Sequence, residues 1–267
     1  MPELPEVQTV LNGFVSAIEA KDIVSLECYY PGTVRTDPSV EDNVFPAKLL
    51  NAVRRGKYMI INLSNEYSLI IHLRMTGKLV FSSLADEPLL HERARFTLGN
   101  GEVVHFIDPR TFGKIILCPT DNLHHYIPLL GMEPLDSGFT PAALTAALKG
   151  KKAPIKTALL DQRIIAGLGN IYVCEILYRA GILPSVPAGK VKAKDIAKIV
   201  HETIIVLSEA IQMGGTSISD FRRIDDKSGE FQHFLRVYQK ANCPKGHKIE
   251  RVAMAGRGTF FCPICQK

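Results

Sequence analysis

Apolar residues near the start of the chain recur at helical spacing. They predict a helix that opens at Pro5 and Glu6 and buries one face, because residues three and four apart lie on the same side of a helix. The buried face of this helix would consist of Val7, Val10, Leu11, Phe14, Val15 and Ile18.

Beyond this helix the pattern changes to runs rich in β-branched and aromatic residues, which predict strands over most of the first 130 residues. Asn100 and Gly101 form a strong hairpin turn between the last two runs. Residues 54–57, Arg-Arg-Gly-Lys, predict a basic turn that enters a strand. The predicted strand regions are 22–30, 48–63, 67–75, 93–98 and 102–107.

The pattern turns helical at Thr140 and Pro141, an N-cap residue followed by a proline suited to the first helical position. Residues 131–141 carry Gly, Pro, Asp and Ser without periodicity, which predicts a boundary near residue 135. Asn170 is a suitable N-cap for the third helix of this half. The predicted helices cover 141–150, 154–161, 171–181 and about 192–213.

Length and composition narrow the class of protein. The 267 residues suffice for about two domains of roughly 150 residues each. Hydrophobic residues make up 46% and charged residues 22% of the chain, which is typical of globular proteins and excludes disordered and fibrous ones. No apolar run reaches the roughly 18 residues of a membrane span, and the first residues lack the layout of a signal peptide. We therefore expect a cytoplasmic protein without a membrane partner.

The net charge of +5 is concentrated at one end of the chain. Residues 240–267 carry six Lys and Arg residues against the single acidic residue Glu250, so the rest of the chain is neutral. A basic tail on a neutral body favours an anionic partner, and nucleic acid is the leading candidate because phosphate neutralisation releases counterions. A basic tail that is merely solvated is the alternative.

Four residues of this tail have the spacing of a structural zinc site. They form Cys-x3-His, then 14 residues, then Cys-x2-Cys, which supplies four N and S ligands in two close pairs. Whether the histidine or a water molecule completes the set is left open, and unliganded cysteines in a frayed tail are the alternative. The candidate ligands are Cys243, His247, Cys262 and Cys265, whereas Cys28, Cys118 and Cys174 are expected to be small core residues.

The segment between the two ligand pairs predicts a hairpin. Residues 247–254 and 259–262 read as strands, and residues 255–258, Ala-Gly-Arg-Gly, read as the turn, with Arg257 projecting from its tip. A tail of 28 residues has few large apolar side chains, so metal ligation would supply much of its folding energy.

Seven motifs run in order from Met1 to Lys267 and together resemble one family. They are MPELPEV, RRGKYMIINL, IIHLRMTGKL, DPRTFG, LLDQRIIAGLGNIYVCEILYRAGI, GGTSISDF and GRGTFFCPICQ. The chain resembles the formamidopyrimidine-DNA glycosylase (Fpg) family, bifunctional base-excision repair enzymes for oxidised purines such as 8-oxoguanine and formamidopyrimidines. The resemblance implies double-stranded DNA with oxidised bases or abasic sites as the partner, and a monomer that is nucleoid-associated when bound to DNA.

The resemblance also implies an α+β multidomain fold. Residues 1–132 would form an N-terminal catalytic β-sandwich flanked by helices. Residues 133–238 would form a helix-two-turn-helix domain, with a lesion-capping loop at about 214–236. Residues 239–267 would form the zinc-bound hairpin.

The family's chemistry falls on the first residues. Removal of the initiator methionine would leave Pro2 with a free secondary amine, and an α-amino group with a pKa near 8 is partly neutral at physiological pH. Attack at the sugar C1′ would displace the damaged base and permit β,δ-elimination, with Glu3 as proton shuttle and Lys57 near the active site. This route needs no metal and no organic cofactor, so the one Zn²⁺ would be purely structural. The alternative is that these residues have only a structural role, as a proline-capped helix start whose acidic side chains interact favourably with the helix dipole.

Further residues match the family's DNA contacts. His72 and Lys57 match phosphate-contacting positions, although a histidine among apolar neighbours is more often a core residue. Flipping a base leaves a hole in the duplex, which apolar wedges and an arginine can fill. The inserted residues would be Met75, Arg110 and Phe112; Lys156, Asn170 and Arg257 would bind the DNA backbone; Glu6, Thr216 and Ser217 would line the lesion pocket.

Two other functions fit much of the same pattern. An endonuclease VIII-like enzyme for oxidised pyrimidines would differ only in the pocket, and Leu4 within Pro-Glu-Leu-Pro-Glu favours Fpg. A non-catalytic damaged-DNA-binding protein would bind the duplex but would not cleave it. The presence of the catalytic candidates Pro2, Glu3 and Lys57 argues against this alternative.

Overall fold

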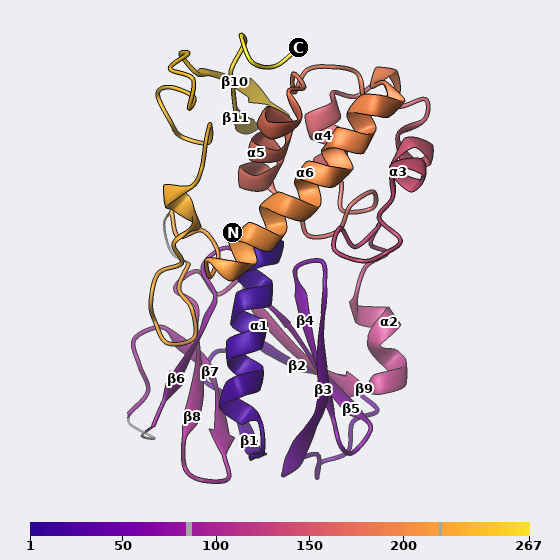
Figure 1. Cartoon of the computed structure of the whole chain (residues 1–267). Helices are drawn as coiled ribbons and strands as arrows, with labels where there is room; N and C mark the ends of the chain where they lie inside the picture. Colours follow the sequence, from indigo (N-terminus) through magenta and orange to yellow (C-terminus); the bar gives the residue numbers. More distant parts are fainter. Residues whose placement is uncertain (84–86, 219–220) are drawn as a thin grey trace. The chain divides into compact units, whose positions relative to one another are not determined.

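The computed structural model describes residues 1–83, 87–218 and 221–267. The chain forms two compact units (Figure 1). The first consists of residues 1–128 and 213–230, and the second of residues 129–212 and 231–267. The three-domain boundaries expected from the sequence stay a prediction.

The first unit opens with helix α1 (Leu4–Ile18), which confirms the helix expected from the apolar spacing. Glu3 is its N-cap residue, and the Glu3 N–H donates to the Glu6 carboxylate at 2.8 Å. The predicted apolar face is buried, except that Val15 is only half-buried. Two short helices, η1 (Thr120–Asn122) and α2 (Leu123–Tyr126), close the first 128 residues.

Nine described strands form one sheet in two halves. One half contains β2, β9, β5, β4 and β3, the other β1, β7, β8 and β6, and a short β1–β3 pairing joins them. The bounds are β1 Asp22–Cys28, β2 Val34–Thr36, β3 Ala47–Arg55, β4 Tyr58–Leu63, β5 Tyr67–His72, β6 Lys78–Ser82, β7 Glu92–Leu98, β8 Val103–Ile107 and β9 Lys114–Pro119. Strands β2, β6 and β9 lie outside the predicted strand regions. The predicted basic turn separates β3 from β4, with Gly56 in the left-handed region at φ 59°.

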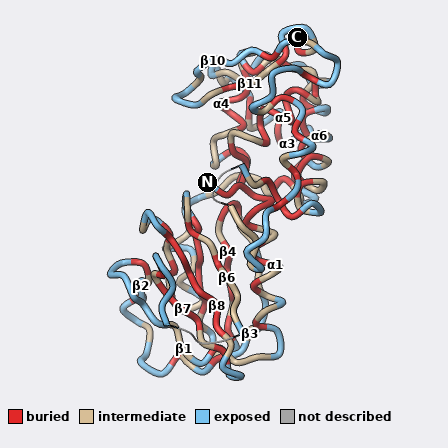
Figure 2. Tube along the Cα trace, turned by 90° about the vertical axis from the view of Figure 1, so that its left-hand side faces the viewer, coloured by how far each residue is buried: buried red, intermediate tan, exposed pale blue. Residues whose placement is uncertain are grey.

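Both halves of the sheet and α1 share one apolar core. Met59, Ile71 and Phe106 come from different strands and join Phe14 of α1 in this core. The Phe14 ring packs edge-on against Phe96 with centroids 5.4 Å apart. Figure 2 shows the buried positions running along the strands. This shared core gives the expected sandwich, with α1 fixed against it.

Residues 213–230 belong to this first unit although they follow the helical half of the chain. The two ends of this segment meet, because the Glu230 N–H donates to the Met213 carbonyl at 2.9 Å. The Phe81 N–H donates to the Ile224 carbonyl at 3.0 Å, so the segment lies along β6 (Figure 1). Part of the loop expected at about 214–236, residues 219–220, lies outside the described residues.

The second unit is helical, as predicted. Its elements are α3 (Pro141–Leu148), α4 (Ile155–Leu160), α5 (Asn170–Ala180), η2 (Ala188–Lys190), α6 (Ala193–Gln212) and η3 (Phe231–His233). Thr140 caps α3 by accepting from the Ala143 N–H at 3.2 Å. The N-cap of α5 is Gly169, whose backbone is extended, and Asn170 is already the first helical residue, so the expected Asn170 cap is wrong. The Asn170 side chain instead donates to the Gly258 carbonyl at 2.9 Å.

A hairpin of β10 (Glu250–Met254) and β11 (Arg257–Phe261) ends the chain. Its turn is shorter than expected and consists of Ala255 and Gly256, both with positive φ. Arg257 therefore starts β11 opposite Met254 instead of forming the tip, and it remains exposed. None of the helices in the described part of the chain combines the length and apolar composition that a membrane span requires.

Candidate active site and metal centre

The beginning of α1 gathers several predicted site residues. Pro2, Glu3 and Glu6 are buried, with 4% and 2% exposure for the two glutamates. One Glu6 oxygen accepts from the Glu3 N–H and the other from the Thr216 N–H, both at 2.8 Å. Gly215 (φ 83°) makes the close approach possible, because a Cβ there would lie 3.1 Å from the Glu6 side chain. Glu6 thus joins the first residues to the 213–230 segment.

Ser217 is held inside that segment. Its hydroxyl donates to the Phe221 carbonyl and accepts from the Gly229 N–H, both at 2.9 Å. Thr216 is 3% exposed. The three predicted pocket residues, Glu6, Thr216 and Ser217, are therefore brought together by the fold.

The β3–β4 turn lies beside the first turns of α1. Arg54 donates to the Gln8 side chain at 3.0 Å and to the Gly56 carbonyl at 3.2 Å. Lys57 follows on this turn and is buried, with 7% exposure. The fold therefore brings the Lys57 turn to the helix that carries Pro2 and Glu3.

His72 is a buried neutral histidine at the end of β5. Its Nδ1 accepts from the Arg74 N–H at 3.0 Å, and its ring packs edge-on against Tyr58. Burial, with the nearby charges of Arg74 and Lys57, lowers the pKa of His72 from 6.5 to about 3. With Nδ1 engaged as an acceptor, the proton sits on Nε2, which leaves that nitrogen as a hydrogen-bond donor.

Three exposed residues from two loops cluster around Arg110, which contacts both of the others. The Arg110 guanidinium donates to the Met75 sulfur at 3.3 Å and lies 5.0 Å from the centroid of the Phe112 ring. Met75 is 42% and Phe112 49% exposed, so two large apolar side chains flank one arginine at the surface. We call these three residues the wedge cluster; they are the three residues expected to enter the duplex.

Asp108 organises the wedge cluster and was not singled out from the sequence. It is fully buried, and its carboxylate accepts from the Arg110 N–H at 3.2 Å, the Gly113 N–H at 2.7 Å and the Thr76 hydroxyl. Its position at the start of Asp-Pro-Arg-Thr-Phe-Gly was an available signal, because aspartate often accepts hydrogen bonds from a following turn.

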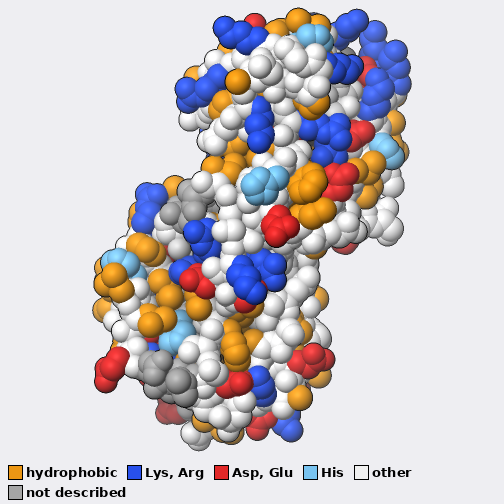
Figure 3. Space-filling model, turned by 60° about the vertical axis from the view of Figure 1, so that its left-hand side comes forward, with side chains coloured by type: hydrophobic (Ala, Val, Ile, Leu, Met, Phe, Trp, Pro, Cys, Tyr) orange, Lys and Arg blue, Asp and Glu red, His pale blue; other side chains and the backbone are white. Residues whose placement is uncertain are grey.

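In the second unit, two of the predicted backbone-binding residues are held against β11. Lys156 is fully buried and donates to the Thr259 hydroxyl at 2.7 Å. Asn170 donates to the Gly258 carbonyl, so both side chains meet the strand that Arg257 begins. Lys and Arg side chains gather on the surface of this unit in the view of Figure 3.

The four candidate zinc ligands converge. The Cys243 and Cys265 sulfurs lie 4.0 Å apart, and His247 Nδ1 lies 3.3 Å from the Cys265 sulfur and 3.8 Å from the Cys262 sulfur. All four ligand atoms lie within 4.8 Å of one another. A tetrahedral zinc with Zn–S bonds of about 2.3 Å separates its sulfur ligands by about 3.8 Å. The donor set therefore fits one structural zinc.

Neighbouring residues fix this metal centre to α5. Tyr178 of α5 and the ligands Cys243 and Cys262 belong to one buried cluster. The Gln266 side chain accepts from the Cys262 N–H and donates to the Ile182 carbonyl, both at 2.7 Å. Such outer contacts orient metal ligands.

Glu175 of α5 is a second buried carboxylate that the sequence analysis did not single out. It is fully buried and accepts from the N–H groups of Arg236, Val237 and Tyr238 at 2.8–2.9 Å. No local pattern predicts this contact, because its partners lie more than 60 residues away.

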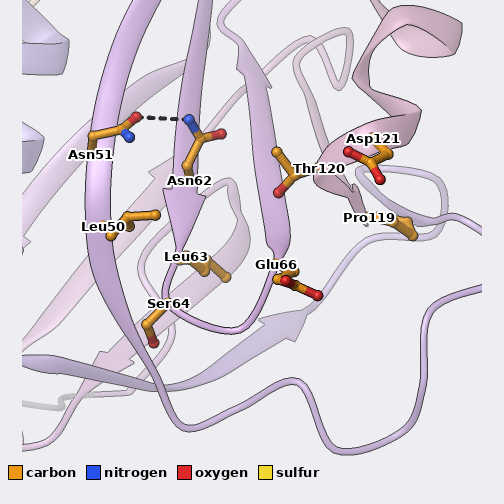
Figure 4. Close-up of a pocket in the computed structure, with 9 residues that line it drawn as sticks. All are labelled: Leu50, Asn51, Asn62, Leu63, Ser64, Glu66, Pro119, Thr120 and Asp121. Carbon is orange, nitrogen blue, oxygen red and sulfur yellow. Dashed lines mark hydrogen bonds between the residues drawn. The ribbon is translucent and has the colours of Figure 1, made fainter.

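A cavity of about 610 Å³ lies elsewhere in the first unit, between β3, β4 and the β9 end (Figure 4). Asn51 accepts from Asn62 at 2.7 Å on its wall, with Glu66 and Asp121 nearby. None of the predicted site residues lines it.

Comparison with known proteins agrees with this geometry. The chain matches the models "Formamidopyrimidine-DNA glycosylase N-terminal domain" over residues 1–115, "Formamidopyrimidine-DNA glycosylase H2TH domain" over 130–222 and "Zinc finger found in FPG and IleRS" over 246–267. A formamidopyrimidine-DNA glycosylase of Pelotomaculum thermopropionicum is 41% identical, with 100% of this chain and 99% of the relative covered. That of Gluconobacter oxydans is 38% identical, with both chains fully covered.

Solved structures show the same fold. A variant of the Lactococcus lactis FPG in complex with Fapy-dG-containing DNA has a TM-score of 0.91 and 34% identity, with both chains fully covered. MutM (Fpg) from Thermus thermophilus has a TM-score of 0.87 and 34% identity over 99% of this chain and 98% of that one. Fold and site thus define a DNA glycosylase. The chain belongs to the formamidopyrimidine-DNA glycosylase family.

Proposed function

We propose that this chain is a base-excision repair DNA glycosylase with abasic-site lyase activity, which removes oxidised purines from double-stranded DNA. The observation that carries the proposal is the buried start of α1, where Glu6 joins the Pro2–Glu3 end to the 213–230 segment. The Lactococcus lactis structure holds Fapy-dG-containing DNA, and a related MutM structure holds carbocyclic 8-oxo-G DNA, which supports an oxidised purine as substrate.

The chemistry would start at the amine of Pro2 once Met1, which is half exposed, is removed. The nitrogen forms a bond to the sugar C1′ while the glycosidic bond to the damaged base breaks, and the base leaves with a proton. Glu3, buried beside the amine, would move that proton. The C1′–O4′ bond then breaks as the ring oxygen takes up, through Glu3, the proton that the amine nitrogen loses, which leaves an iminium between the nitrogen and C1′. The iminium acidifies the C2′ proton, so β-elimination and then δ-elimination release the flanking phosphates.

Lys57 and His72 would contact phosphates near the lesion. The neutral His72 offers its Nε2–H to a phosphate oxygen, and Lys57 supplies the positive charge. The wedge cluster would enter the duplex: Met75 and Phe112 replace lost stacking, and Arg110 presents donors to the estranged base. Their mutual contacts and exposure support this role.

In the second unit, Lys156, Asn170 and Arg257 would bind backbone phosphates, with Lys156 and Asn170 positioned by β11. Cys243, His247, Cys262 and Cys265 would hold the zinc, whose role is to fold the hairpin that carries Arg257. Glu6, Thr216 and Ser217 would line the lesion pocket.

The three-domain division at residues 132 and 238 is proposed on the same resemblance. The enzyme would act as a monomer in the cytoplasm and associate with the nucleoid when bound to DNA.

Borohydride trapping tests the proposal. The protein is incubated with duplexes that carry 8-oxoguanine, thymine glycol or an abasic site, and covalent adducts are resolved by gel electrophoresis. We expect trapping on the 8-oxoguanine and abasic duplexes. Preference for thymine glycol would indicate the endonuclease VIII-like alternative, and binding without any adduct would indicate a non-catalytic damaged-DNA-binding protein.

A further inference from the structure

The 213–230 segment meets helix α1 at two separate places. The first is the Glu6–Thr216 hydrogen bond near the candidate nucleophile. The second lies two turns further along α1, where Ile224 packs over Gly13. Ser217 lies between these two contacts in the segment, and both contacts are made to the same helix.

Gly13 forms a socket for Ile224. An ideal Cβ on residue 13 would lie 2.5 Å from Ile224 Cγ2 and 3.2 Å from Ile224 Cβ. Glycine inside a helix is less favourable than alanine, and Gly13 lies well inside Leu4–Ile18. The close approach of Ile224 gives a physical reason for a glycine at this position.

Other contacts hold the segment near Ile224, where it packs on Gly13 of α1. Phe221 and Ile224 pack against the apolar core of the first unit. The Phe81 N–H donates to the Ile224 carbonyl at 3.0 Å, and Lys78 pairs with Asp226 at 2.8 Å. The ion pair is partly exposed and adds little, so the second place rests on the apolar packing of Ile224 and Phe221 and on the Phe81 hydrogen bond.

The two glycines of the segment that lie nearest the candidate nucleophile need neighbouring contacts to hold their backbone in one conformation. Gly214 and Gly215 both have positive φ, at 69° and 83°, and glycine backbones are the most easily reoriented. A segment with this composition keeps one position only if contacts on either side hold it. Glu6 provides one contact, and the Gly13 socket provides the next.

We propose that Gly13 and Ile224 are positioning residues that make excision of an intact oxidised base depend on the 213–230 segment, while abasic-site cleavage does not depend on it. The inference rests on the proposed function. An abasic site offers no base for Thr216 or Ser217 to contact, so the chemistry of Pro2 at C1′ proceeds without the segment.

Single-turnover rates on 8-oxoguanine and abasic duplexes test this division. We expect Ile224→Ala to lower the 8-oxoguanine excision rate about tenfold, because the loop spends less time in its productive position. Abasic cleavage should stay within about twofold of the wild-type rate. Ile204→Ala, the same change at a 39% exposed position of α6, is the matched control and should change neither rate.

Gly13→Ala gives a second, independent test. The alanine favours the helix but displaces Ile224, so excision should fall although α1 is not weakened. In the Ile224→Ala background the 2.5 Å approach to Cγ2 is gone and only the 3.2 Å approach to the Cβ of residue 224 remains, so Gly13→Ala should slow excision much less there than in the wild-type background.

The possible results separate cleanly. Equal losses on both duplexes would mean a merely structural role, and unchanged excision in both variants would mean no role; either overturns the inference. A wild-type protein that is inactive on both duplexes would instead reject the proposed function. Abasic cleavage by each variant serves as the check that it is folded.

Discussion

The buried carboxylate of Glu175 provides a sharp test of how the second unit is held together. It accepts three backbone hydrogen bonds, two at one oxygen from Val237 and Tyr238 and one at the other from Arg236. Hydrogen bonds to a charged group contribute about 1.5–3 kcal/mol each. Because Arg236 is exposed, the hydrogen bond from its N–H to Glu175 contributes about 1.5 kcal/mol or less. Replacement of this side chain should therefore destabilise the unit measurably.

The two replacements should differ in a defined order. Glu175→Gln keeps one oxygen, which can still accept from Val237 and Tyr238, but it places an NH₂ donor opposite the Arg236 N–H donor. We expect the free energy of unfolding to fall by about 2 kcal/mol. Glu175→Ala leaves all three donors without an acceptor and should cost about 4 kcal/mol. Glu202→Gln on α6 is the matched control, since it removes a surface carboxylate that is only half-buried.

Urea unfolding followed by the fluorescence of a zinc chelator reports on this unit specifically. The midpoint should fall in the order wild type, Glu175→Gln, Glu175→Ala, and zinc should be released at lower urea in the same order. A Glu175→Gln protein as stable as Glu202→Gln would refute the reasoning, because the carboxylate charge and the Arg236 hydrogen bond would then contribute no net free energy.

Four further predictions concern the termini, the histidine and the DNA contacts. A residue inserted before Pro2 removes the free amine, so borohydride trapping should vanish while binding to an abasic analogue survives; excision at the native rate would contradict this. The folded pKa of His72 lies below its unfolded value, so the unfolded state binds the proton first and stability falls as pH drops from about 6.5 toward 3. His72→Gln should lose less stability than wild type over that range in urea titrations at each pH. His247→Ala should lose zinc on metal analysis, and a full equivalent of zinc would exclude His247 as an essential ligand. Arg257→Ala should lower the slope of log affinity against log salt by about one, whereas Phe112→Ala should cost about 1–3 kcal/mol without that change in slope.

Local patterns predicted the elements whose signals lie within a few residues. Helix α1, the Thr140 cap and the terminal hairpin all follow from spacing and turn chemistry. The three-residue strand β2 has no such signal, because it exists only through its parallel pairing with β9. Strand β9, Lys114–Pro119, did carry a β-branched run that the pattern analysis passed over.

The candidate site divides in the same way. Motif residues such as Glu6 and the zinc ligands could be named from the sequence because each motif is short. Asp108 and Glu175 act through groups that only the fold brings near them, so their roles became visible with the contacts. Cys28 was expected in the core but is exposed at the end of β1, where burial depends on what covers the strand end.

Helix α5 makes the zinc-bound hairpin inseparable from the helices around it. Its first residue, Asn170, is hydrogen-bonded to β11, and Glu175 in its middle is hydrogen-bonded to residues 236–238. Tyr178 in its last turn packs in one buried cluster with the metal ligands Cys243 and Cys262. A hairpin cut out of the chain would lose all three attachments. In native-state hydrogen exchange, α5 and the hairpin should therefore open as one cooperative unit. Loss of the metal should speed amide exchange in α5 as well as in the hairpin.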